Sequence, residues 1–528
     1  MPKTEVLIVG GGVTGAGIAR DLALRGTSVM LLEKEDFSTG ATGRSHGMLH
    51  SGGRYAVKDP ESAMDCAREG VILKRIASYC IEDTGGLFIG IEDDDPTYVD
   101  RFLRGCAETG VQAKEITTKE ALSLEPRLSS RVSSSVEVLD ASIDPFALTL
   151  GNVEDARDCG AEILNYRVVQ RFLVQEGRIQ EVIFENLRNG SRESVRPEVV
   201  VNASGAWVDN VASLAGLRIP MSIDKGTLVV FNGRLVNRLI NRLRMPSDGD
   251  IIVPSHSASI VGTTSDRVDS VEDFVVDRSD VDLLISEGQS MVPDLRHARA
   301  IRAYAGVRPL LGGRKEGRDI SRTYRVIDHE EEGIDNLVSI VGGKLTTYRL
   351  MAEKTSDLIM CKLGSAGHCI TASEPISNPM AAKTVRDLLA FPLIRMNRKY
   401  GDEQTDIIAG CTSSLRGKEI LCTCEEVLRG EAEYFCSRED VMRLSDVMRR
   451  TRIGMGYCQA GLCIFDMASV MMEHSNQEPL DLIGHYLRER WKGVEPVLFG
   501  SQLRQEVFKR YLYDGVYHLE SLLGGEAR

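Results

Sequence analysis

An α/β fold organised around a parallel sheet is what this chain of 528 residues predicts, and three observations near its start predict it. The apolar run at 6–9 (VLIV) has the composition of a buried parallel strand. Glycines in the pattern G-x-G-x-x-G follow it and lead into a helical stretch at 16–26. A second strand-like run at 28–32 ends at the acidic Glu33. Strand, glycine turn, helix, strand and acidic end in this order predict a Rossmann-type dinucleotide-binding domain.

Each glycine of the turn has a separate role. Gly10 permits the tight turn, Gly12 lets the backbone approach a pyrophosphate, and Gly15 lets the helix pack closely on the strand. The start of the helix, beside Val13 and Thr14, offers free N–H groups and partial positive charge. These residues are therefore expected to contact the phosphates of a dinucleotide.

Two features after the second strand narrow the cofactor to FAD. The Glu33 carboxylate, next to Lys34, can accept hydrogen bonds from ribose hydroxyls, which favours an unphosphorylated ribose. The stretch 39–49 (TGATGRSHGML) is too rich in glycine and small polar residues for an ordinary amphipathic helix. It resembles the second phosphate- and flavin-contacting segment of glycine- and D-amino-acid-oxidase-like flavoproteins. The cofactor contacts that this resemblance implies here are Thr42, Gly43, Arg44, Ser45, Gly47, Met48 and Leu49.

Two later segments are expected to return to the same cofactor. Residues 199–202 form an apolar strand followed by ASGAW, and 337–344 (LVSIVGGK) form another that ends at a glycine pair. A helix that starts after Lys344 would direct its positive end at the flavin and stabilise reduced anionic flavin, although an ordinary strand-turn-helix connection is the alternative. The further cofactor contacts expected are Ala203, Gly205, Gly306, Gly343, Leu345 and Thr346.

The length implies several domains. We expect the FAD-binding domain to be assembled from separated pieces of a region spanning 1–370, with an α+β substrate domain between them. Strand candidates TLVVF and ASIVGTT belong to the substrate domain. The expected FAD-binding pieces are 1–80, 140–216 and 326–370; the substrate pieces are 81–139 and 217–325; a linker or helical stretch covers 371–410, with TASEPISNPMAA at 371–382; a small four-cysteine module covers 411–475; and a C-terminal helical segment covers 476–528.

Charge and composition exclude several classes of function. The net charge is −13 and there is no basic block, which argues against nucleic-acid binding. The start MPKTEVLIVG enters its first strand at once, so we expect no signal peptide and a cytoplasmic location. No apolar run is long enough to span a bilayer, so any membrane connection is expected to be peripheral and through partner subunits. The apolar positions of the C-terminal segment favour a packing face over a membrane anchor.

Four of the twelve cysteines are placed like metal ligands. Cys422 and Cys424 form C-x-C, and Cys458 and Cys463 form C-x4-C; four thiolates suit zinc or an iron-sulfur cluster. Structural zinc usually prefers C-x2-C, and the pattern TRxGMGxCQxxxC resembles the bacterioferritin-associated-ferredoxin-like module, which carries a [2Fe-2S] cluster. Zinc and unliganded thiols are the alternatives. Other cysteines lack paired spacing and are expected to be buried thiols, among them Cys66, Cys106, Cys361 and Cys436.

Several phrases extend a family resemblance over nearly the whole chain. They are GGGVTGAGIARDLALRG, GATGRSHGMLHSGGRYAV, RAYAGVRPL, GGKLTTYRLMAE, RRTRIGMGYCQAGLC and RERWKGVEP. The chain resembles the A subunits of anaerobic glycerol-3-phosphate dehydrogenases; single-subunit relatives share the flavoprotein half only. The resemblance implies oxidation of sn-glycerol 3-phosphate to dihydroxyacetone phosphate, with hydride passing to flavin N5. Electrons would then leave through a [2Fe-2S] cluster to partner subunits and, indirectly, to a respiratory quinone.

Such a substrate has a dianionic head and a secondary alcohol, so its pocket needs fixed cations. Arginine can hold two phosphate oxygens with its planar fork, and lysine supplies a point charge. The family-matching Arg54, Arg308 and Lys344 are therefore the candidates for binding the phosphate and the alkoxide. A solvated surface side chain is the alternative interpretation of each. Tyr55 and Thr346 are weaker candidates for substrate contact.

A base must take the hydroxyl proton as hydride leaves. His50 is our first candidate, with His46 second and His256 another, because imidazole titrates in the physiological range; a structural histidine is the alternative. The single-subunit relatives have a histidine after a Lys-Gly pair, whereas this chain has Thr227 there. Their base therefore cannot be transferred directly, and a nearby lysine or a bound water is a further alternative.

Two rival functions stay open. Flavoproteins that oxidise glycine, proline or hydroxyproline can carry similar four-cysteine modules, and their carboxylate substrates also recruit arginine. A noncatalytic subunit would use its FAD and cluster only to relay electrons or to scaffold a complex. Reduction of the flavin by each substrate in turn would separate these alternatives.

Overall fold

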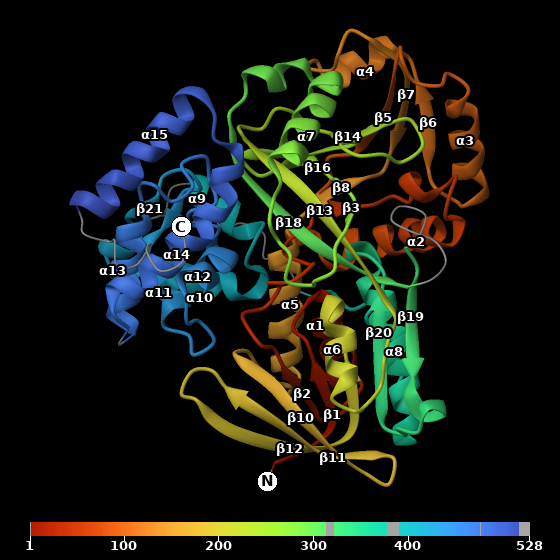
Figure 1. Cartoon of the computed structure of the whole chain (residues 1–528), viewed down its shortest axis with the longest axis vertical. Coiled ribbons are helices and arrows are strands. Elements are labelled where there is room, and N and C mark those ends of the chain that lie inside the picture. Colours follow the sequence, from red (N-terminus) through yellow and green to blue (C-terminus); the bar gives the residue numbers. More distant parts are fainter. Residues whose placement is uncertain (1, 313–321, 377–389, 476, 517–528) are drawn as a thin grey trace.

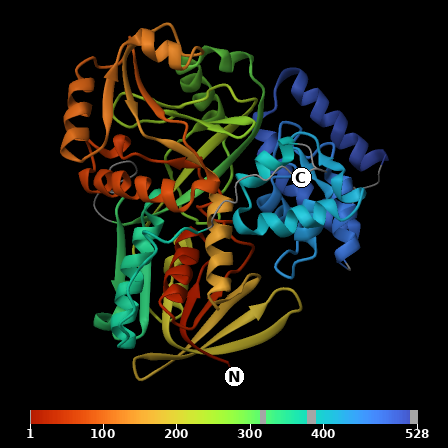
Figure 2. The ribbon, with the colours of Figure 1, turned by 180° about the vertical axis from the view of Figure 1, so that it is seen from behind.

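The computed structural model describes residues 2–312, 322–376, 390–475 and 477–516, and most of its strands lie in two sheets. Figure 1 shows one sheet in the lower half of the molecule, near the N-terminus, and the other above it. The C-terminal helices form a separate lobe beside both, and Figure 2 shows the same lobe from behind. No helix within the described ranges is long and apolar enough to cross a bilayer.

The lower sheet has a parallel core whose strands come from distant parts of the chain. Its parallel strands, in spatial order, are β9 (Glu162–Leu164), β2 (Val29–Leu32), β1 (Lys3–Val9), β12 (Ser191–Asn202) and β20 (Leu337–Gly342). Three antiparallel strands extend it: β10 (Arg167–Gln175), β11 (Arg178–Asn186) and β19 (Tyr324–Asp328). The strands predicted at 6–9, 28–32, 199–202 and 337–344 are thereby confirmed, and all of them lie in this sheet.

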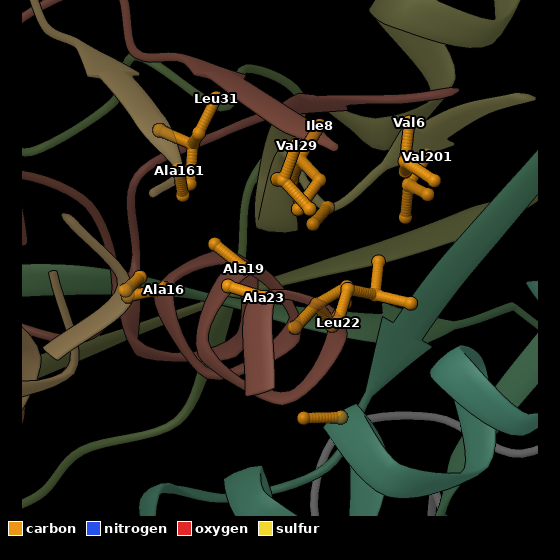
Figure 3. Packing of buried hydrophobic residues seen from close by; sticks show 14 of the residues in the cluster. Val6, Ile8, Ala16, Ala19, Leu22, Ala23, Val29, Leu31, Ala161 and Val201 are labelled. Carbon is orange, nitrogen blue, oxygen red and sulfur yellow. The ribbon is translucent and has the colours of Figure 1, made fainter. Parts of the chain in front are cut away.

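Helix α1 (Val13–Leu24) packs on this sheet beside α5 (Pro145–Asp158) and α8 (Tyr348–Leu363). In Figure 3, strand side chains such as Ile8 face helix side chains such as Leu22, both fully buried. The helix begins and ends earlier than predicted, because Gly12 already serves as its N-cap and Gly26 has a left-handed φ of 82° that ends the helical backbone. A Cβ on Gly15 would lie 1.9 Å from the Gly10 carbonyl oxygen, so the close packing requires glycine.

The upper sheet is mainly antiparallel and carries the predicted strands TLVVF and ASIVGTT in β13 and β16. Its strands are β5 (Gly86–Ile91), β6 (Ala113–Ile116), β7 (Val132–Val138), β13 (Met221–Asn232), β14 (Leu239–Arg242), β15 (Ile251–Ser255), β16 (Ala258–Gly262), β17 (Asp266–Arg267) and β18 (Ala300–Leu311). Its helices are α3 (Tyr98–Glu108), α4 (Thr118–Leu124) and α7 (Arg278–Met291). A small sheet lies near the junction, with β3 (Met48–Leu49), β4 (Ile81–Glu82) and β8 (Ala141–Ile143), and α2 (Pro60–Ile76) follows the first of these strands.

The C-terminal lobe is helical except for one short hairpin. Its elements are α9 (Ala390–Asn397), α10 (Gln404–Thr412), β21 (Ile420–Cys422), β22 (Val427–Leu428), α11 (Arg429–Cys436), α12 (Leu444–Thr451), α13 (Ile464–His474), α14 (Pro479–Val494) and α15 (Gly500–Tyr511). The last two confirm the predicted helical character of the C-terminal segment where it is described. Outside the described residues lie 377–389 of the predicted linker or helical stretch, 313–321 of the predicted substrate domain, and 476 and 517–528 of the final segment. The domain boundaries themselves stay a prediction.

Buried ion pairs fix the C-terminal lobe to the lower sheet. Asp36, just after β2, accepts hydrogen bonds from Arg449 Nε at 2.7 Å and from Arg450 Nη1 at 2.8 Å. The Asp36 side chain is fully buried, and the two arginines hold the pKa of its carboxyl below the ordinary value although burial alone would raise it. The Tyr166 hydroxyl donates to Asp446 at 2.7 Å in the same interface. The lobe is therefore held against the sheet by groups that are out of contact with water.

The unpaired cysteines differ in their burial. Cys66, Cys106 and Cys436 are buried, as predicted. Cys159 is exposed and Cys369 is partly exposed, so the prediction of buried thiols fails for them. Cys361 is exposed as well, and the prediction is wrong there too. It lies near the end of α8, and the buried side of this turn is occupied by Met360 and its neighbours.

Candidate functional site

A cavity of about 870 Å³ lies between the two sheets, at the carboxyl ends of the parallel strands. Val9 and Leu32, the last residues of β1 and β2, line it from below, and Gly226 and Gly306 line it from β13 and β18. Open α/β sheets bind ligands at this edge, because the loops that follow parallel strands meet there. The cavity is therefore the candidate site for both cofactor and substrate.

The part of the cavity nearest α1 fits a dinucleotide pyrophosphate. Gly12 caps α1 without a side-chain hydrogen bond, and Val13 and Thr14 line the cavity just inside the helix. The Val13 N–H donates to Thr42 Oγ1 at 3.2 Å, which ties the second glycine-rich segment to the helix start. Gly10 has a φ of 115°, and a Cβ there would lie 2.6 Å from the Ala203 carbonyl oxygen. The glycines thus leave a concave stretch of bare backbone at the start of α1, which we call the cradle. Side chains at these positions would fill it, and an anion needs this open space to reach the helix start.

Glu33 and Lys34 lie at the end of β2, where the predicted ribose contacts belong. The Glu33 carboxylate accepts hydrogen bonds from the backbone N–H groups of Gly11 at 2.6 Å and Glu35 at 2.9 Å. Burial raises the pKa of Glu33, and these two donors oppose that rise. The Lys34 ammonium lies 3.9 Å from the centre of the Trp207 ring.

The predicted cofactor residues divide into two groups. Those that line the cavity are Gly10, Gly12, Val13, Thr14, Glu33, Lys34, Thr42, Arg44, Ser45, Met48, Ala203, Gly205, Gly306, Gly343 and Leu345. Those that do not line it are Gly15, Gly43, Gly47, Leu49 and Thr346. The second group supports the wall from behind: a Cβ on Gly43 would lie 2.2 Å from the Ser38 carbonyl oxygen, and Thr346 Oγ1 accepts a hydrogen bond from the His50 N–H at 3.0 Å.

The other part of the cavity collects the predicted cations Arg54, Arg308 and Lys344 from three separate elements. Arg54 lies in the 3-10 turn Gly53–Tyr55, and its Nη2 donates to Asp250 Oδ2 at 3.3 Å. Arg308, on β18, donates from Nη1 to Asp224 Oδ1 at 3.0 Å. Both aspartate side chains are almost fully buried. Each arginine is thus held in position by a carboxylate behind it.

Lys344 follows β20 and lies beside Tyr55. Its Nζ donates to the Arg322 carbonyl oxygen at 2.8 Å and is 4.6 Å from the centre of the Tyr55 ring. Burial lowers the pKa of Lys344, whereas burial raises the pKa of Tyr55 to about 12, so the phenol stays protonated at neutral pH.

Arg322 is a cavity residue that sequence reasoning missed. It lines the cavity, and its Nη2 is 3.6 Å from Asp224 Oδ2. In the β19–β20 hairpin, Tyr324 pairs with Gly342, and extending this antiparallel register by two residues places Arg322 opposite Lys344. Recognition of the hairpin would therefore have provided the signal that brings this arginine to the site.

His46 and His50 both line the cavity, and their rings meet edge-on with centroids 5.9 Å apart. Burial, followed by the charge of Arg54 and Arg308, lowers the pKa of His46 to about 3. Burial also lowers the pKa of His50 well below its ordinary value. Both rings are neutral at physiological pH, and within the described ranges the Nδ1 atoms of both are buried without a hydrogen-bond partner. They can accept a proton, but they are weaker bases than a free imidazole.

His256, and Thr227 at the place of the relatives' histidine, do not line the cavity. His256 Nε2 lies 3.5 Å from Asp144 Oδ2, near the C-terminal lobe. The Thr227 hydroxyl donates to Asp280 Oδ2 at 2.6 Å. The structure therefore favours His50 and His46 over His256 by position.

The four spaced cysteines lie in the C-terminal lobe as two thiol pairs, Cys422 with Cys463 and Cys424 with Cys458. Backbone N–H groups of Gly454 and Glu425 donate to the Cys422 sulfur, and that of Cys458 donates to Cys424. In the part of the chain that the structure describes, no set of three or more His, Cys, Asp or Glu side chains is arranged to hold a metal ion. The thiols and their N–H donors nevertheless have the chemistry of an iron-sulfur site.

Comparison with known proteins places the chain among flavoproteins. The model of the FAD dependent oxidoreductase family matches residues 5–358. The A subunit of the anaerobic glycerol-3-phosphate dehydrogenase of Escherichia coli K12 is 41% identical over 98% of this chain and 97% of its own, and that of Haemophilus influenzae is 40% identical over 98% and 94%. The glycerol-3-phosphate dehydrogenase of Bacillus halodurans, solved in complex with FAD, aligns with a TM-score of 0.72 at 22% identity, covering 94% of this chain and 96% of its own. The predicted flavoprotein fold is thereby confirmed.

Proposed function

The chain belongs to the FAD-dependent oxidoreductase family, among the relatives of the anaerobic glycerol-3-phosphate dehydrogenase A subunits, and we propose that it oxidises sn-glycerol 3-phosphate to dihydroxyacetone phosphate. One observation carries this proposal. Arg54, Arg308 and Lys344 enter one cavity from three elements and lie in the same space as the glycine-lined cradle for a dinucleotide. A phosphate-bearing alcohol and a flavin are the pair of ligands that this combination suits.

We assign the cations of the cavity to different parts of the substrate. The Arg308 and Arg54 guanidinium groups bind the dianionic phosphate, with Arg322 as a third donor, because planar forks hold two oxygens each. Asp224 and Asp250 keep the forks in place before the substrate arrives, so less entropy is lost on binding. Lys344, close to neutral Tyr55, is assigned to the hydroxyl oxygen at C2, where its charge stabilises a developing alkoxide.

Oxidation at C2 removes a hydride from carbon and a proton from the hydroxyl oxygen. Bound FAD supplies the hydride acceptor at N5. We assign the proton to a neutral imidazole nitrogen of His50, with His46 next to it as the alternative. Burial lowers the pKa of both rings, so the imidazolium formed would lose its proton to water readily.

The residues proposed to hold FAD are those that line the cradle. Gly12, Val13 and Thr14 would bind the pyrophosphate, and Glu33 would bind the adenosine ribose. The second glycine-rich segment and the turns after β12 and β20 would contact the rest of the cofactor. The short 3-10 turn Leu345–Thr347 that precedes α8 is proposed to direct its N–H groups at the flavin N1–C2 edge.

Electrons are proposed to leave through a [2Fe-2S] cluster held by Cys422, Cys424, Cys458 and Cys463. The two thiol pairs and the backbone N–H donors around Cys422 and Cys424 support a cluster. The relatives are named as A subunits, which supports the presence of companion subunits. We propose that single electrons pass to these companions and from them to a quinone. The link to the cell membrane would then run through those companions.

A second candidate function rests on the same arginines. A carboxylate also accepts two hydrogen bonds from a guanidinium fork, so Arg54 and Arg308 would suit an amino acid such as proline or glycine. Phosphate is favoured because the three guanidinium groups and Lys344 outnumber the two aspartates behind the arginines, which leaves more positive charge than one carboxylate needs.

Anaerobic titration of the FAD-loaded chain tests the proposal. sn-Glycerol 3-phosphate should bleach the flavin absorbance fully, whereas glycerol, L-proline and glycine should leave it unchanged. Bleaching by proline or glycine alone would favour the second candidate. No bleaching by any of them, with FAD bound, would contradict catalysis by this chain alone and favour a relay subunit.

A further inference from the structure

Helix α15 (Gly500–Tyr511) has its polarity reversed relative to an ordinary surface helix. The side chains that it buries are polar, Gln502 and Glu506. The side chains that it exposes include a row of apolar residues, with exposed fractions of 43% for Leu503, 53% for Val507, 62% for Phe508 and 65% for Tyr511. A surface helix normally directs its apolar stripe at the core. Among the residues that the structure describes, none covers this stripe of α15 fully.

Hydrogen bonds keep this orientation. Gln502 Nε2 donates to the Ala300 carbonyl oxygen on β18 at 2.8 Å. Glu506 accepts from Arg490 on α14 at 3.4 Å and from Lys509 at 2.9 Å, with its side chain almost completely buried. Rotation of the helix to bury the apolar stripe would break these bonds and leave buried polar groups unpaired. The exposed face is thus fixed by the fold.

Helix α15 also packs against the cysteine loop, since a Cβ on Gly461 would lie 3.3 Å from Lys509 Nζ. Arg490, which binds Glu506, also donates to the carbonyl oxygen of Gln459, next to Cys458. Behind the cysteine loop, the rings of Phe465 and Tyr513 pack edge-on with centroids 5.9 Å apart. On the loop itself Tyr457 is 59% exposed and Leu462 is 70% exposed, and Cys424 and Cys458 are only partly buried. In Figures 1 and 2 α15 runs along the outer side of the C-terminal lobe.

We propose that this surface, which we call the α15 patch (Leu503, Val507, Phe508, Tyr511, Tyr457 and Leu462), docks a companion protein that accepts electrons from the cysteine site. The inference rests on the proposed function, because it needs electrons to arrive at the cysteines. An apolar centre rich in aromatic residues next to a redox site is what a protein acceptor needs, since the contact both excludes water and brings the acceptor close.

The charge beside the patch fits a partner protein with an acidic rim. Arg504 is exposed on α15 next to the patch, and Arg510 stacks over the Trp491 ring with its guanidinium carbon 5.1 Å from the ring centre. Acidic side chains on a partner would complement these arginines.

Charged substitutions in the patch test the proposal on the full chain. The variants are Phe508→Glu and Val507→Glu, and Ser501→Glu is the control, because Ser501 is exposed on the same helix but outside the patch. The probe is membrane vesicles from the source organism, prepared from cells that lack this chain and retain the companion subunits and quinone. The rate of electron transfer from glycerol 3-phosphate to these vesicles is compared with the rate to a soluble phenazine dye.

Both patch variants should lower the vesicle-dependent rate about tenfold or more, since truncated or charged hot spots at interfaces typically cost at least 1.4 kcal/mol, which is a factor of ten. The dye rate and the FAD content should stay unchanged, and Ser501→Glu should behave as the unmodified chain. Full vesicle-dependent rates in both patch variants would overturn the proposal. So would equal binding losses on protein-free phosphatidylglycerol vesicles, which would assign the patch to the bilayer.

Photocrosslinking separates this inference from the proposed function, because it needs no substrate. With Phe508→p-benzoylphenylalanine in the chain, illumination with the same vesicles should join it to a different protein that carries its own flavin or iron-sulfur cofactor, identified by mass spectrometry. A cross-link to such a protein supports the docking surface even if glycerol 3-phosphate fails to bleach the flavin. A cross-link to a second copy of this chain, or to lipid alone, would overturn it.

Discussion

The cavity and the cysteine site differ in their exposure to water. In the cavity the functional groups lie deep between two sheets, and Arg54 and Arg308 are each braced by an aspartate that is almost fully buried. At the cysteine site two of the four thiols are partly exposed, and the surrounding loop displays Tyr457 and Leu462 to solvent. Hydride transfer requires a dry, fixed geometry, whereas export of single electrons requires that a partner come close. One chain can therefore satisfy both requirements by separating them in space.

The largest difference between the two regions should appear when one cysteine of the quartet is removed. In Cys458→Ser the proposed cluster loses a ligand, so electron transfer to vesicles or to a companion protein should be abolished while glycerol 3-phosphate still bleaches the flavin. Iron and acid-labile sulfide analysis, with electron paramagnetic resonance of the reduced protein, measures the first effect, and flavin absorbance measures the second.

The matched control is Cys361→Ser, which removes an exposed thiol outside the quartet. It should keep iron content and both rates. Equal loss of flavin reduction and electron export in Cys458→Ser would instead mean that the module has a structural role.

Arg450→Ala should weaken the interface between the C-terminal lobe and the flavoprotein half. The change removes one of the two arginines that donate to the buried Asp36 and leaves Arg449. Breaking a buried ion pair costs about 3 kcal/mol of folding stability. We expect a lower thermal unfolding midpoint and faster proteolysis between the flavoprotein half and the C-terminal lobe. Arg131→Ala, which removes an exposed pair with Asp93, should leave both measurements unchanged. An unfolding midpoint that Arg450→Ala does not move would show that the interface is held by other contacts.

Arg308→Ala tests whether the cavity holds the phosphate. Loss of a charge-assisted fork costs about 2–3 kcal/mol, which lowers kcat/KM about 30- to 150-fold, mainly through KM. FAD content should not change, because Arg308 lies on β18, whereas the proposed pyrophosphate contacts lie at the start of α1. Steady-state kinetics with a phenazine dye measure the effect, with Arg127→Ala on the surface as the control. Unchanged kinetics would remove Arg308 from the substrate site.

The titration of Lys344 should change kcat/KM less than the substitutions above do. Burial lowers its pKa from the ordinary value of 10.5, so its positive charge is present at low pH and is lost as the pH rises through that lowered pKa. The kcat/KM value should therefore fall on the alkaline side, about tenfold per pH unit, with a break below pH 10.5. Lys344→Arg keeps the charge and should move the break to higher pH. An alkaline limb that is identical in Lys344→Arg would assign the titration to another group.

Local patterns in the sequence were sufficient for the elements at the α1 end of the cavity, where we propose that FAD binds. The strand, glycine turn and helix at the N-terminus follow from short-range rules, and so does the need for glycine at Gly15, which packs against Gly10. What could not be predicted depends on long-range pairing. Arg322 reaches the cavity only through the β19–β20 register, and Asp224 and Asp250 brace arginines that are distant in the chain.

Two other features of the structure also depend on long-range pairing. His256 is as plausible by residue type as His50, but the fold carries it to Asp144 and away from the cavity. The apolar residues of α15 suggested a packing face, and the structure turns that face outward because the polar Gln502 and Glu506 bind inside. Residue type and spacing do not reveal which side of a helix finds partners in a distant strand.

Anaerobic stopped-flow absorbance decides whether substrate is oxidised in the cavity and whether electrons leave through the cysteines. The chain, loaded with FAD and iron-sulfur cluster, is mixed with sn-glycerol 3-phosphate. We predict flavin bleaching first and reduction of the iron-sulfur bands afterwards, at a rate that Cys458→Ser removes without slowing the bleaching. Reduction of the iron-sulfur bands before the flavin, or no reduction of a verifiably bound flavin, would contradict this sequence of events.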